Sequence, residues 1–164
     1  RFLAGNRACA RELTLFFAPN INSYKRFAAG SFAPTTIAWG DDNRTCAFRV
    51  VGHGPGKRIE CRVPGGDVNP YLAIAALIAS GLHGIDKKLK LQPALVGNAY
   101  EDTQHERVPS TLREARELFA ASKIALDAFG EEVVGHYLNM ADVEIAAYDA
   151  AVTDWERVRG FERL

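Results

Sequence analysis

Lys57-Arg-Ile-Glu-Cys-Arg-Val-Pro64 alternates charged and apolar side chains, which is the period-two pattern of a β-strand with one buried face. The pattern predicts that Arg58, Glu60 and Arg62 share one face of this strand. The other face is expected to point into a core and carries Ile59, Cys61 and Val63. One carboxylate between two guanidinium groups suits a site that holds a divalent cation beside anionic ligands.

Basic residues gather around this strand, although the chain as a whole is neutral. Guanidinium groups bind carboxylate and phosphate in bidentate fashion, so such a cluster is able to hold a polyanion and an amino-acid carboxylate together. Within it, Glu60 offers the hard oxygen ligand that Mg²⁺ or Mn²⁺ prefers. The alternative is a surface ladder of salt bridges, which residue types alone favour, because exposed ion pairs contribute only about 0–1 kcal/mol. The basic residues are Arg44, Arg49, Lys57, Arg58 and Arg62.

The composition bounds the class of protein. With 164 residues, 48% of them hydrophobic, one domain around one core is expected. Lysine plus arginine and aspartate plus glutamate each number 20, a balance that indicates neither a nucleic-acid partner nor an anionic membrane surface. The three cysteines lack metal-ligand or redox spacing and are expected to be reduced thiols of a cytoplasmic protein. The apolar run over 71–79 is too short to span a bilayer, which needs roughly 20 residues.

The first part of the chain is predicted to form one helix and three strands. A helix is expected over 1–18, ended by Pro19-Asn20, and a polar, aromatic loop over 22–30 follows it. The turn Gly52-His-Gly-Pro-Gly56 separates the second and third strands. The predicted strands are 35–39, 45–51 and 58–63.

Helices are predicted for most of the remainder. Asn69 and Pro70 mark the N-cap and first position of a helix over 71–80, which is apolar on all sides and therefore expected to be buried. A glycine, Gly81 or Gly84, is expected to end it. A polar connector is expected over 87–110. A helix over 111–130 follows, with Thr111 and Glu114 as its capping box, and a last helical stretch covers 131–158. The fold class is therefore α/β (α+β), with short, mainly antiparallel strands backed by helices and a helical C-terminus.

Six blocks of this sequence, in order and spacing, resemble the glutamine synthetase superfamily. The resemblance is close over about 1–85 and looser over the C-terminal helices, and it favours the functional interpretation of the charged strand over the salt-bridge ladder. The blocks are Asn22-Ser-Tyr-Lys-Arg26, Ala33-Pro34, Trp39-Gly-Asp-Asp-Asn-Arg44, Arg58-Ile-Glu-Cys-Arg62, Asn69-Pro-Tyr-Leu-Ala73 and Gly81-Leu-His-Gly-Ile85.

The resemblance implies an ATP-dependent ligase that phosphorylates the γ-carboxylate of glutamate and then lets an amine displace the phosphate. Carried over by position, Arg26 would bind the substrate glutamate and Arg62 would clamp its α-carboxylate. Arg44 would be the catalytic residue that reaches both the transferring phosphoryl group and the glutamate. Arg49 and Arg58, with Arg44, would hold the ATP phosphates.

Glu60 would be a ligand to Mg²⁺ or Mn²⁺ in the same resemblance. These roles agree with the physics of phosphoryl transfer, which is largely positioning and charge neutralisation.

One departure from the family pattern concerns the amine. Ammonia-using members carry Gly-Tyr-Glu-Ala-Pro where this chain has Gly30-Ser-Phe-Ala-Pro34, so Phe32 stands at the position of a glutamate that collects ammonium. Loss of that carboxylate removes a charge-assisted contact, typically worth about 1.5–3 kcal/mol. A phenyl ring packs on an alkyl chain or faces a cation instead. The segment is similar to the subgroup that glutamylates polyamines, putrescine or ethanolamine, and we expect an acceptor-amine pocket at Phe32.

The resemblance also implies that residues 1–164 are the C-terminal portion of the catalytic domain. The smaller N-terminal β-domain, the first half of the catalytic domain and the other metal ligands would lie outside it, so we expect no turnover by these 164 residues alone. The full-length protein would be a large ring-based homo-oligomer, a dodecamer, with active sites between subunits. Tyr100 lies roughly where some bacterial members carry a nucleotide-modified tyrosine, but its surroundings do not match and no modification is predicted.

Three hypotheses of function follow. The first is a γ-glutamyl–amine ligase for an organic amine, and the second is an ammonia-dependent glutamine synthetase. The third is a catalytically silent family member with a structural role, against which the intact cluster of arginines argues.

Overall fold

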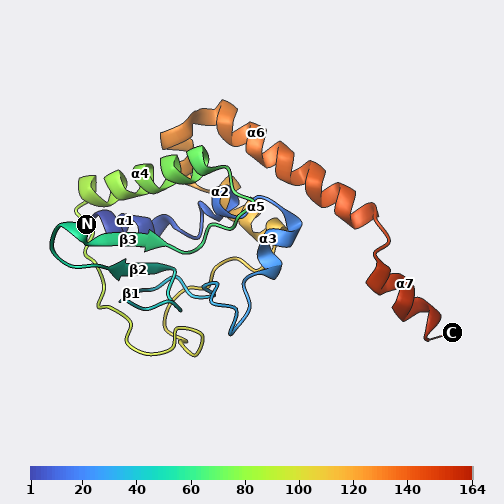
Figure 1. The fold of residues 1–164 in the computed structure, drawn as a ribbon. Helices are drawn as coiled ribbons and strands as arrows, with labels where there is room; N and C mark the ends of the chain where they lie inside the picture. The colour runs from blue at the N-terminus through green and yellow to red at the C-terminus, as the bar shows by residue number, and fades with distance from the viewer. Residues whose placement is uncertain (164) are drawn as a thin grey trace.

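The computed structural model describes residues 1–163, in which helices lie on one side of a small sheet and loops on the other (Figure 1). The helices are α1 (Phe2–Cys9), α2 (Thr14–Phe17), α3 (Ile21–Lys25), α4 (Pro70–Asp86), α5 (Leu112–Ala120), α6 (Lys123–Ala150) and α7 (Asp154–Phe161). The strands are β1 (Trp39–Asp41), β2 (Phe48–Val51) and β3 (Arg58–Cys61), with a short 3₁₀ turn, η1 (Gly54–Gly56), between the last two. No helix in this part of the chain has the length and apolar character needed to cross a membrane.

The sheet is mixed. β1 pairs with β2 in parallel, and β2 pairs with β3 in antiparallel fashion, with Arg49 directly opposite Glu60. The α/β class is therefore confirmed, but the strands are not mainly antiparallel. The predicted strand 35–39 overlaps β1 only at Trp39, where β1 begins. Earlier in that range, Thr36 forms an isolated bridge with Arg107, so the prediction did not indicate the parallel pair.

The alternation of side chains in β2 is confirmed, whereas that in β3 is confirmed only in part. Phe48 and Val50 are buried, as predicted. On the matching face of β3, however, Ile59 is 40% exposed, because the tip of the β2–β3 hairpin extends beyond the core. Val63, just past the strand, is fully buried and closes this side of the core.

The N-terminal helices are shorter and more numerous than predicted. The helix expected over 1–18 is interrupted after Cys9 and resumes as α2. The loop expected over 22–30 begins with α3, which has a capping box formed by Asn20 and Ser23. These short helices place aromatic rings in the core, where the Phe16 ring meets the rings of Phe119, Phe129 and Tyr137 edge-on at 4.8–5.2 Å between centroids.

α4 begins as predicted but does not end at a glycine. The Asn69 side chain accepts a hydrogen bond from the Tyr71 amide, and the helix then runs through both Gly81 and Gly84 to Asp86. α4 lies along α1 (Figure 1). Both glycines face it, and a Cβ on Gly84 would lie within 3.0 Å of main-chain atoms of Gly5. They are therefore residues of close helix packing rather than helix terminators.

The prediction that the whole of α4 is buried was wrong. Its α1 side is buried, but the opposite side carries an exposed apolar stripe. An exposed face of this kind is typical of a surface that another part of a protein or another subunit covers. The stripe consists of Tyr71, Ile74, Ile78, Leu82 and Ile85.

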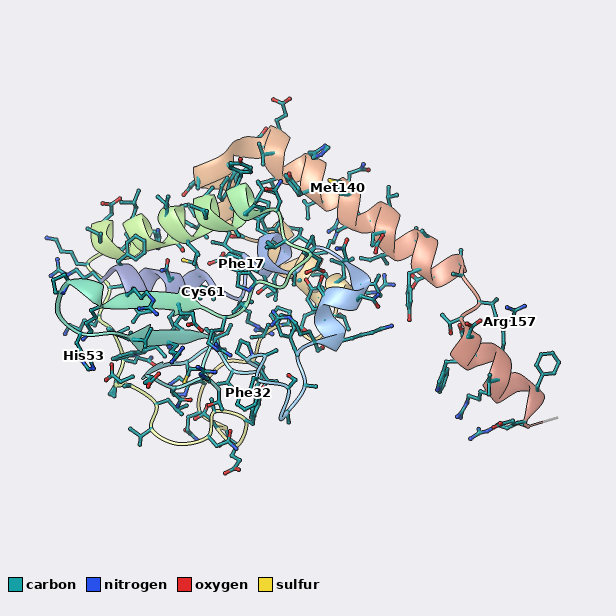
Figure 2. All side chains as sticks on the ribbon, viewed as in Figure 1. Phe17, Phe32, His53, Cys61, Met140 and Arg157 are labelled. Atoms are coloured by element: carbon teal, nitrogen blue, oxygen red, sulfur yellow. The ribbon has the colours of Figure 1, made fainter. Side chains whose placement is uncertain are left out.

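The C-terminal helices confirm the break expected near Gly130, but a further break, between α5 and α6, was not expected. The Thr111 side chain caps α5 as predicted, but the Glu114 carboxylate bonds to Ser110 rather than completing a box. α5 ends at Ala120, and α6 starts after Ser122 and passes through a kink at Gly130, which has φ +79°. α6 leads away from the body of the molecule, and α7 lies at its far end (Figures 1 and 2).

Candidate active site

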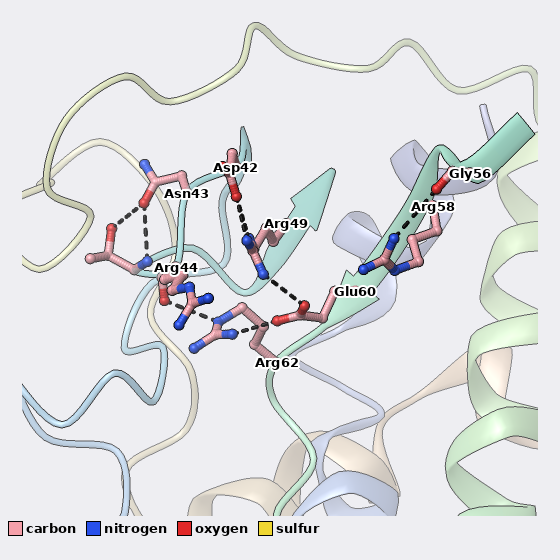
Figure 3. Close-up of polar contacts among 9 residues, drawn as sticks. Asp42, Asn43, Arg44, Arg49, Gly56, Arg58, Glu60 and Arg62 are labelled. Atoms are coloured by element: carbon pink, nitrogen blue, oxygen red, sulfur yellow. Dashed lines mark hydrogen bonds and ion pairs between the residues drawn. The ribbon is translucent and has the colours of Figure 1, made fainter. Parts of the chain in front are cut away.

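Glu60 lies at the centre of a polar cluster on the face of the sheet formed by β2 and β3 (Figure 3). It faces Arg49 across the strands, and the Arg49 Nη1 donates a hydrogen bond to Glu60 Oε2 at 3.0 Å. Arg49 also donates from Nε to Asp42 Oδ1 at 2.8 Å. The predicted strand face is therefore real, and the pairing register of β2 with β3 supplies a guanidinium for its carboxylate.

Arg62 connects this cluster to two other segments of the chain. Its Nη1 donates to Glu60 Oε1, its Nε donates to the Arg44 carbonyl at 3.0 Å, and its Nη2 donates to the Phe32 carbonyl at 2.8 Å. One side chain thus joins β3, the turn after β1 and the segment around Phe32. This contact places the main chain of Phe32 beside the charged strand.

The electrostatics of the cluster keep both carboxyl groups ionised. The hydrogen bond from Arg62, followed by the charges of Arg62 and Arg49, holds the pKa of Glu60 below its usual value against the opposing effect of burial. The hydrogen bond from Arg49 lowers the pKa of Asp42 in the same way. Both acids are therefore anionic at neutral pH, and each is already partnered by a guanidinium.

The segment Gly30-Ser-Phe-Ala-Pro34 forms a tight turn, which we call the acceptor segment. Phe32 has φ +59°, a left-handed conformation that is rare for a bulky residue, and its ring is 62% exposed. Figure 2 shows it on the side of the sheet away from α4. The turn therefore directs an aromatic ring into solvent instead of burying it.

Arg26 lies where the acceptor segment approaches the end of β3. Its guanidinium donates to the Val63 carbonyl and stacks over the Phe27 ring at 4.9 Å from the centroid. Burial lowers the pKa of Arg26, and the nearby Asp67 charge partly offsets that effect. Asp67 itself accepts hydrogen bonds from Ser23 and Asn20 at 2.5 and 3.3 Å, so this corner is a polar network attached to the start of α3.

The other two predicted arginines stand apart from Glu60. Arg44 is exposed on the turn after β1, where it lines an open cavity of about 450 Å³ with Asp41, Leu95 and Gly97. Arg58, at the start of β3, reaches only the Gly56 carbonyl at 3.4 Å (Figure 3). The structure therefore gathers Arg49, Glu60, Arg62 and Phe32 through direct contacts, while Arg44 joins through its main chain and Arg58 lies outside this network.

The described residues, 1–163, do not by themselves form a metal site. Across residues 1–163, no group of three or more histidine, cysteine, aspartate or glutamate side chains is close enough together to hold an ion. Both Glu60 oxygens accept hydrogen bonds from guanidinium groups. Glu60 can supply one oxygen ligand, but the usual six ligands of Mg²⁺ would require groups from elsewhere.

Sequence reasoning missed two contributors to the site. Asp42 is adjacent to the Asn43-Arg44 motif, and its φ of +49°, which aspartate tolerates better than most residues, marks a tight turn. Tyr100 donates from its hydroxyl to the Ala33 carbonyl at 3.0 Å, across a sequence separation of 67 residues. A local pattern could have indicated the turn at Asp42, but no local pattern indicates the partner of Tyr100.

A mixed α/β fold that presents several guanidinium groups around one carboxylate is suited to hold anionic groups. Residues 1–159 match the glutamine synthetase catalytic domain, and the chain belongs to this family.

Individual relatives resemble the chain along nearly all of its length. The chain is 63% identical, over 99% of its length and 35% of the relative's, to γ-glutamylethanolamide synthetase GlnA4 of Streptomyces coelicolor. It is 44% identical, over 96% of its length and 35% of the relative's, to a glutamate–isopropylamine ligase of a Pseudomonas species. Several further relatives are named glutamine synthetase and are 34–45% identical.

A solved structure described as a GmaS/ADP complex shares the fold with a TM-score of 0.87. Its sequence is 31% identical, and the match covers 98% of this chain and 39% of that one. The chain thus spans about a third of the length of these relatives.

Proposed function

We propose that this chain is the C-terminal portion, residues 1–164, of the catalytic domain of an ATP-dependent ligase that joins the γ-carboxylate of glutamate to an organic amine. The observation that carries the choice of amine is the exposed Phe32 ring on a turn that Arg62 ties to Glu60. The 63% identity to a γ-glutamylethanolamide synthetase supports the same choice.

The reaction has two steps that the cluster suits. A γ-carboxylate oxygen of glutamate attacks the terminal phosphorus of ATP, and ADP leaves with the electrons of the broken P–O bond. The amine nitrogen then attacks the acyl carbon of γ-glutamyl phosphate, phosphate leaves, and the nitrogen loses a proton. In both steps the main task of the protein is to position anions and neutralise their charge, which fixed guanidinium groups do well.

The roles of individual residues are part of this proposal. Arg26 and Arg62 bind glutamate, and Arg44 reaches the transferring phosphoryl group. Arg49 and Arg58 hold the ATP phosphates, which requires Arg58 to turn from its present contact with the Gly56 carbonyl. The ADP named in the related GmaS structure supports a nucleotide site in this fold.

Glu60 would contribute one ligand to Mg²⁺ or Mn²⁺ in the full-length protein, with the remaining ligands supplied from outside residues 1–163. This assignment fits the hardness of the carboxylate, and each Glu60 oxygen keeps a lone pair besides the one that accepts from Arg49 or Arg62. Isothermal titration of Mn²⁺ into the full-length protein and its Glu60→Gln variant tests it. Equal affinity in both proteins would refute the role of Glu60.

A panel of acceptors tests the proposed reaction. The full-length protein, with glutamate and Mg-ATP, is assayed for phosphate release with ethanolamine, putrescine, spermine and ammonium. We expect the highest kcat/KM with one of the organic amines, whereas best turnover with ammonium would identify an ordinary glutamine synthetase. Absence of calorimetric ATP binding to the full-length protein would favour the catalytically silent alternative.

The apolar stripe on α4 supports the further proposal that the full-length protein is a large homo-oligomer, since such a face is suited to burial. Light scattering of the full-length protein would measure its mass. We also expect residues 1–164 alone to show no glutamate-dependent ATP hydrolysis, because the described residues hold no complete metal site. Detectable hydrolysis by this piece would contradict that expectation.

A further inference from the structure

The acceptor segment holds a conformation that needs external support. A non-glycine residue with positive φ costs of the order of 1–3 kcal/mol and persists where surrounding contacts determine it. Phe32 has φ +59° and its ring is 62% exposed, so burial of the side chain supplies little of that support. The contacts that keep the turn in place must therefore come largely from its main chain and its neighbours.

Hydrogen bonds from three side chains supply this support. Ser31 donates from its hydroxyl to the Ala28 carbonyl at 2.6 Å and accepts from the Ala33 amide at 3.1 Å. Arg62 donates to the carbonyl of Phe32, and Tyr100 donates to the next carbonyl, that of Ala33. The two peptide units on either side of Ala33 are thereby fixed from outside the turn.

Tyr100 is itself held before it makes this contact. Its amide donates to Asn98 Oδ1 at 3.1 Å, and the preceding residue, Ala99, is fully buried. The Ala99 amide donates to the Thr45 hydroxyl at 2.9 Å, and the Ala99 carbonyl accepts from the Thr36 hydroxyl at 2.8 Å. A hydroxyl on so fixed a backbone loses little conformational freedom when it binds, and this makes it an effective anchor.

We propose that Tyr100 is a positioning residue for acceptor specificity: its hydroxyl anchors the acceptor segment so that the Phe32 ring stands where the amine binds. The proposal rests on the proposed function and deepens it. Among the described residues, Tyr100 forms no hydrogen bond with the arginines of the cluster or with Glu60, so its effect is expected to fall mainly on the amine. Ordering of the turn before the amine arrives removes an entropic cost from binding.

The test is Tyr100→Phe in the full-length protein, with whichever acceptor the wild type turns over best. Loss of one hydrogen bond of ordinary strength corresponds to a rise of about three- to tenfold in KM for the acceptor. The KM values for glutamate and ATP should stay within about twofold, and so should kcat. Tyr137→Phe is the matched control, because that ring packs edge-on against Phe16 in the core and lies outside the site.

A double-mutant cycle separates positioning from general structure. If Tyr100 acts through the ring of Phe32, then Tyr100→Phe should have no further effect on acceptor KM in a Phe32→Ala background. An unchanged acceptor KM in the single variant, equal increases in all three KM values, or additive effects in the cycle would each overturn the proposal. If ammonium is the best acceptor, the organic-amine function fails, whereas the cycle still decides the role of Tyr100.

Discussion

Substitution of Phe32 by glutamate should shift the acceptor preference from an organic amine toward ammonium. The fold tolerates this change, because the ring is 62% exposed and the hydrogen bond to Arg62 uses the main-chain carbonyl, which every residue has. Glutamate is no more strained than phenylalanine at φ +59°, so the turn itself is unaffected. The variant therefore changes the chemistry of the acceptor pocket while its geometry stays the same.

The size of the shift in acceptor preference follows from two contributions: the apolar contact that the organic amine loses and the charged contact that ammonium gains. An aromatic side chain buries about 150–250 Å² in full, so the exposed part of Phe32 offers roughly 100–150 Å² to an amine. If an organic amine covers half of it, the contact is worth about 1.5 kcal/mol, or roughly tenfold in kcat/KM. A new carboxylate adds about 1.5–3 kcal/mol for ammonium, so the ratio of kcat/KM for the two acceptors should change by at least about a hundredfold.

The assay measures phosphate release by the full-length protein with each acceptor. Phe32→Gln is the matched control, because it has the size and hydrogen-bonding capacity of glutamate without the charge, and Phe32→Leu reports the loss of aromaticity alone. We expect the glutamine variant to lose the organic amine without gaining ammonium. A Phe32→Glu variant with the wild-type acceptor ratio would refute the assignment of Phe32 to the amine pocket.

Three further predictions concern stability. Gly84→Ala should lower the free energy of unfolding by about 1–3 kcal/mol, since a Cβ there would lie within 3.0 Å of the Gly5 main chain, which cannot yield as a side chain would. Tyr24→Phe should raise the free energy of unfolding by about 1 kcal/mol, because the Tyr24 hydroxyl is buried and has no hydrogen-bond partner among the described residues. Glu60→Gln should weaken the dependence of the free energy of unfolding on pH in the acid range. The pKa of Glu60 in the folded protein lies below its unfolded value of 4.5. The ionised carboxylate therefore stabilises the wild type fully above about that pH, and this stabilisation is lost as the pH falls through the folded pKa.

Chemical denaturation of the full-length protein measures all three effects. Gly135→Ala is the control for Gly84, because nothing lies within 4 Å of its Cβ position in α6, and alanine should stabilise that helix by about 0.5–1 kcal/mol. Equal effects of the two glycine substitutions would contradict close packing of α1 on α4. A marked loss of stability in Tyr24→Phe, or identical pH profiles of Glu60→Gln and wild type, would likewise contradict the corresponding contact.

The local part of the site could be predicted from the sequence. Period-two alternation placed Arg58 and Glu60 on one face, and the antiparallel register then brought Arg49 opposite Glu60. The resemblance added Phe32, which the structure links to the same cluster through Arg62. These features depend on residues close in sequence or on motifs in a fixed order.

The parts that sequence could not supply depend on distant contacts. Hydrophobicity alone suggested complete burial of α4, yet one side is exposed, because apolar composition does not say which faces have a partner. Gly81 and Gly84 have the signature of helix termination, but the approach of α1 decides their role. Similarly, strand propensity over 35–39 did not decide pairing, since the carbonyl and amide groups of that segment bond in part to the connector near Arg107.

The charge balance of the cluster argues against a purely structural role. Arg49 and Arg62 bond to Asp42 and Glu60, and the exposed Arg44 lies nearby on the turn after β1. This region therefore has three guanidinium groups and two hydrogen-bonded carboxylates. Guanidinium groups brought together in this way repel one another, so a protein selected only for stability gains more from apolar residues at such positions. The excess positive charge becomes favourable once an anion arrives between the segments. The same geometry that costs stability in the free protein therefore suits the proposed site for ATP and glutamate.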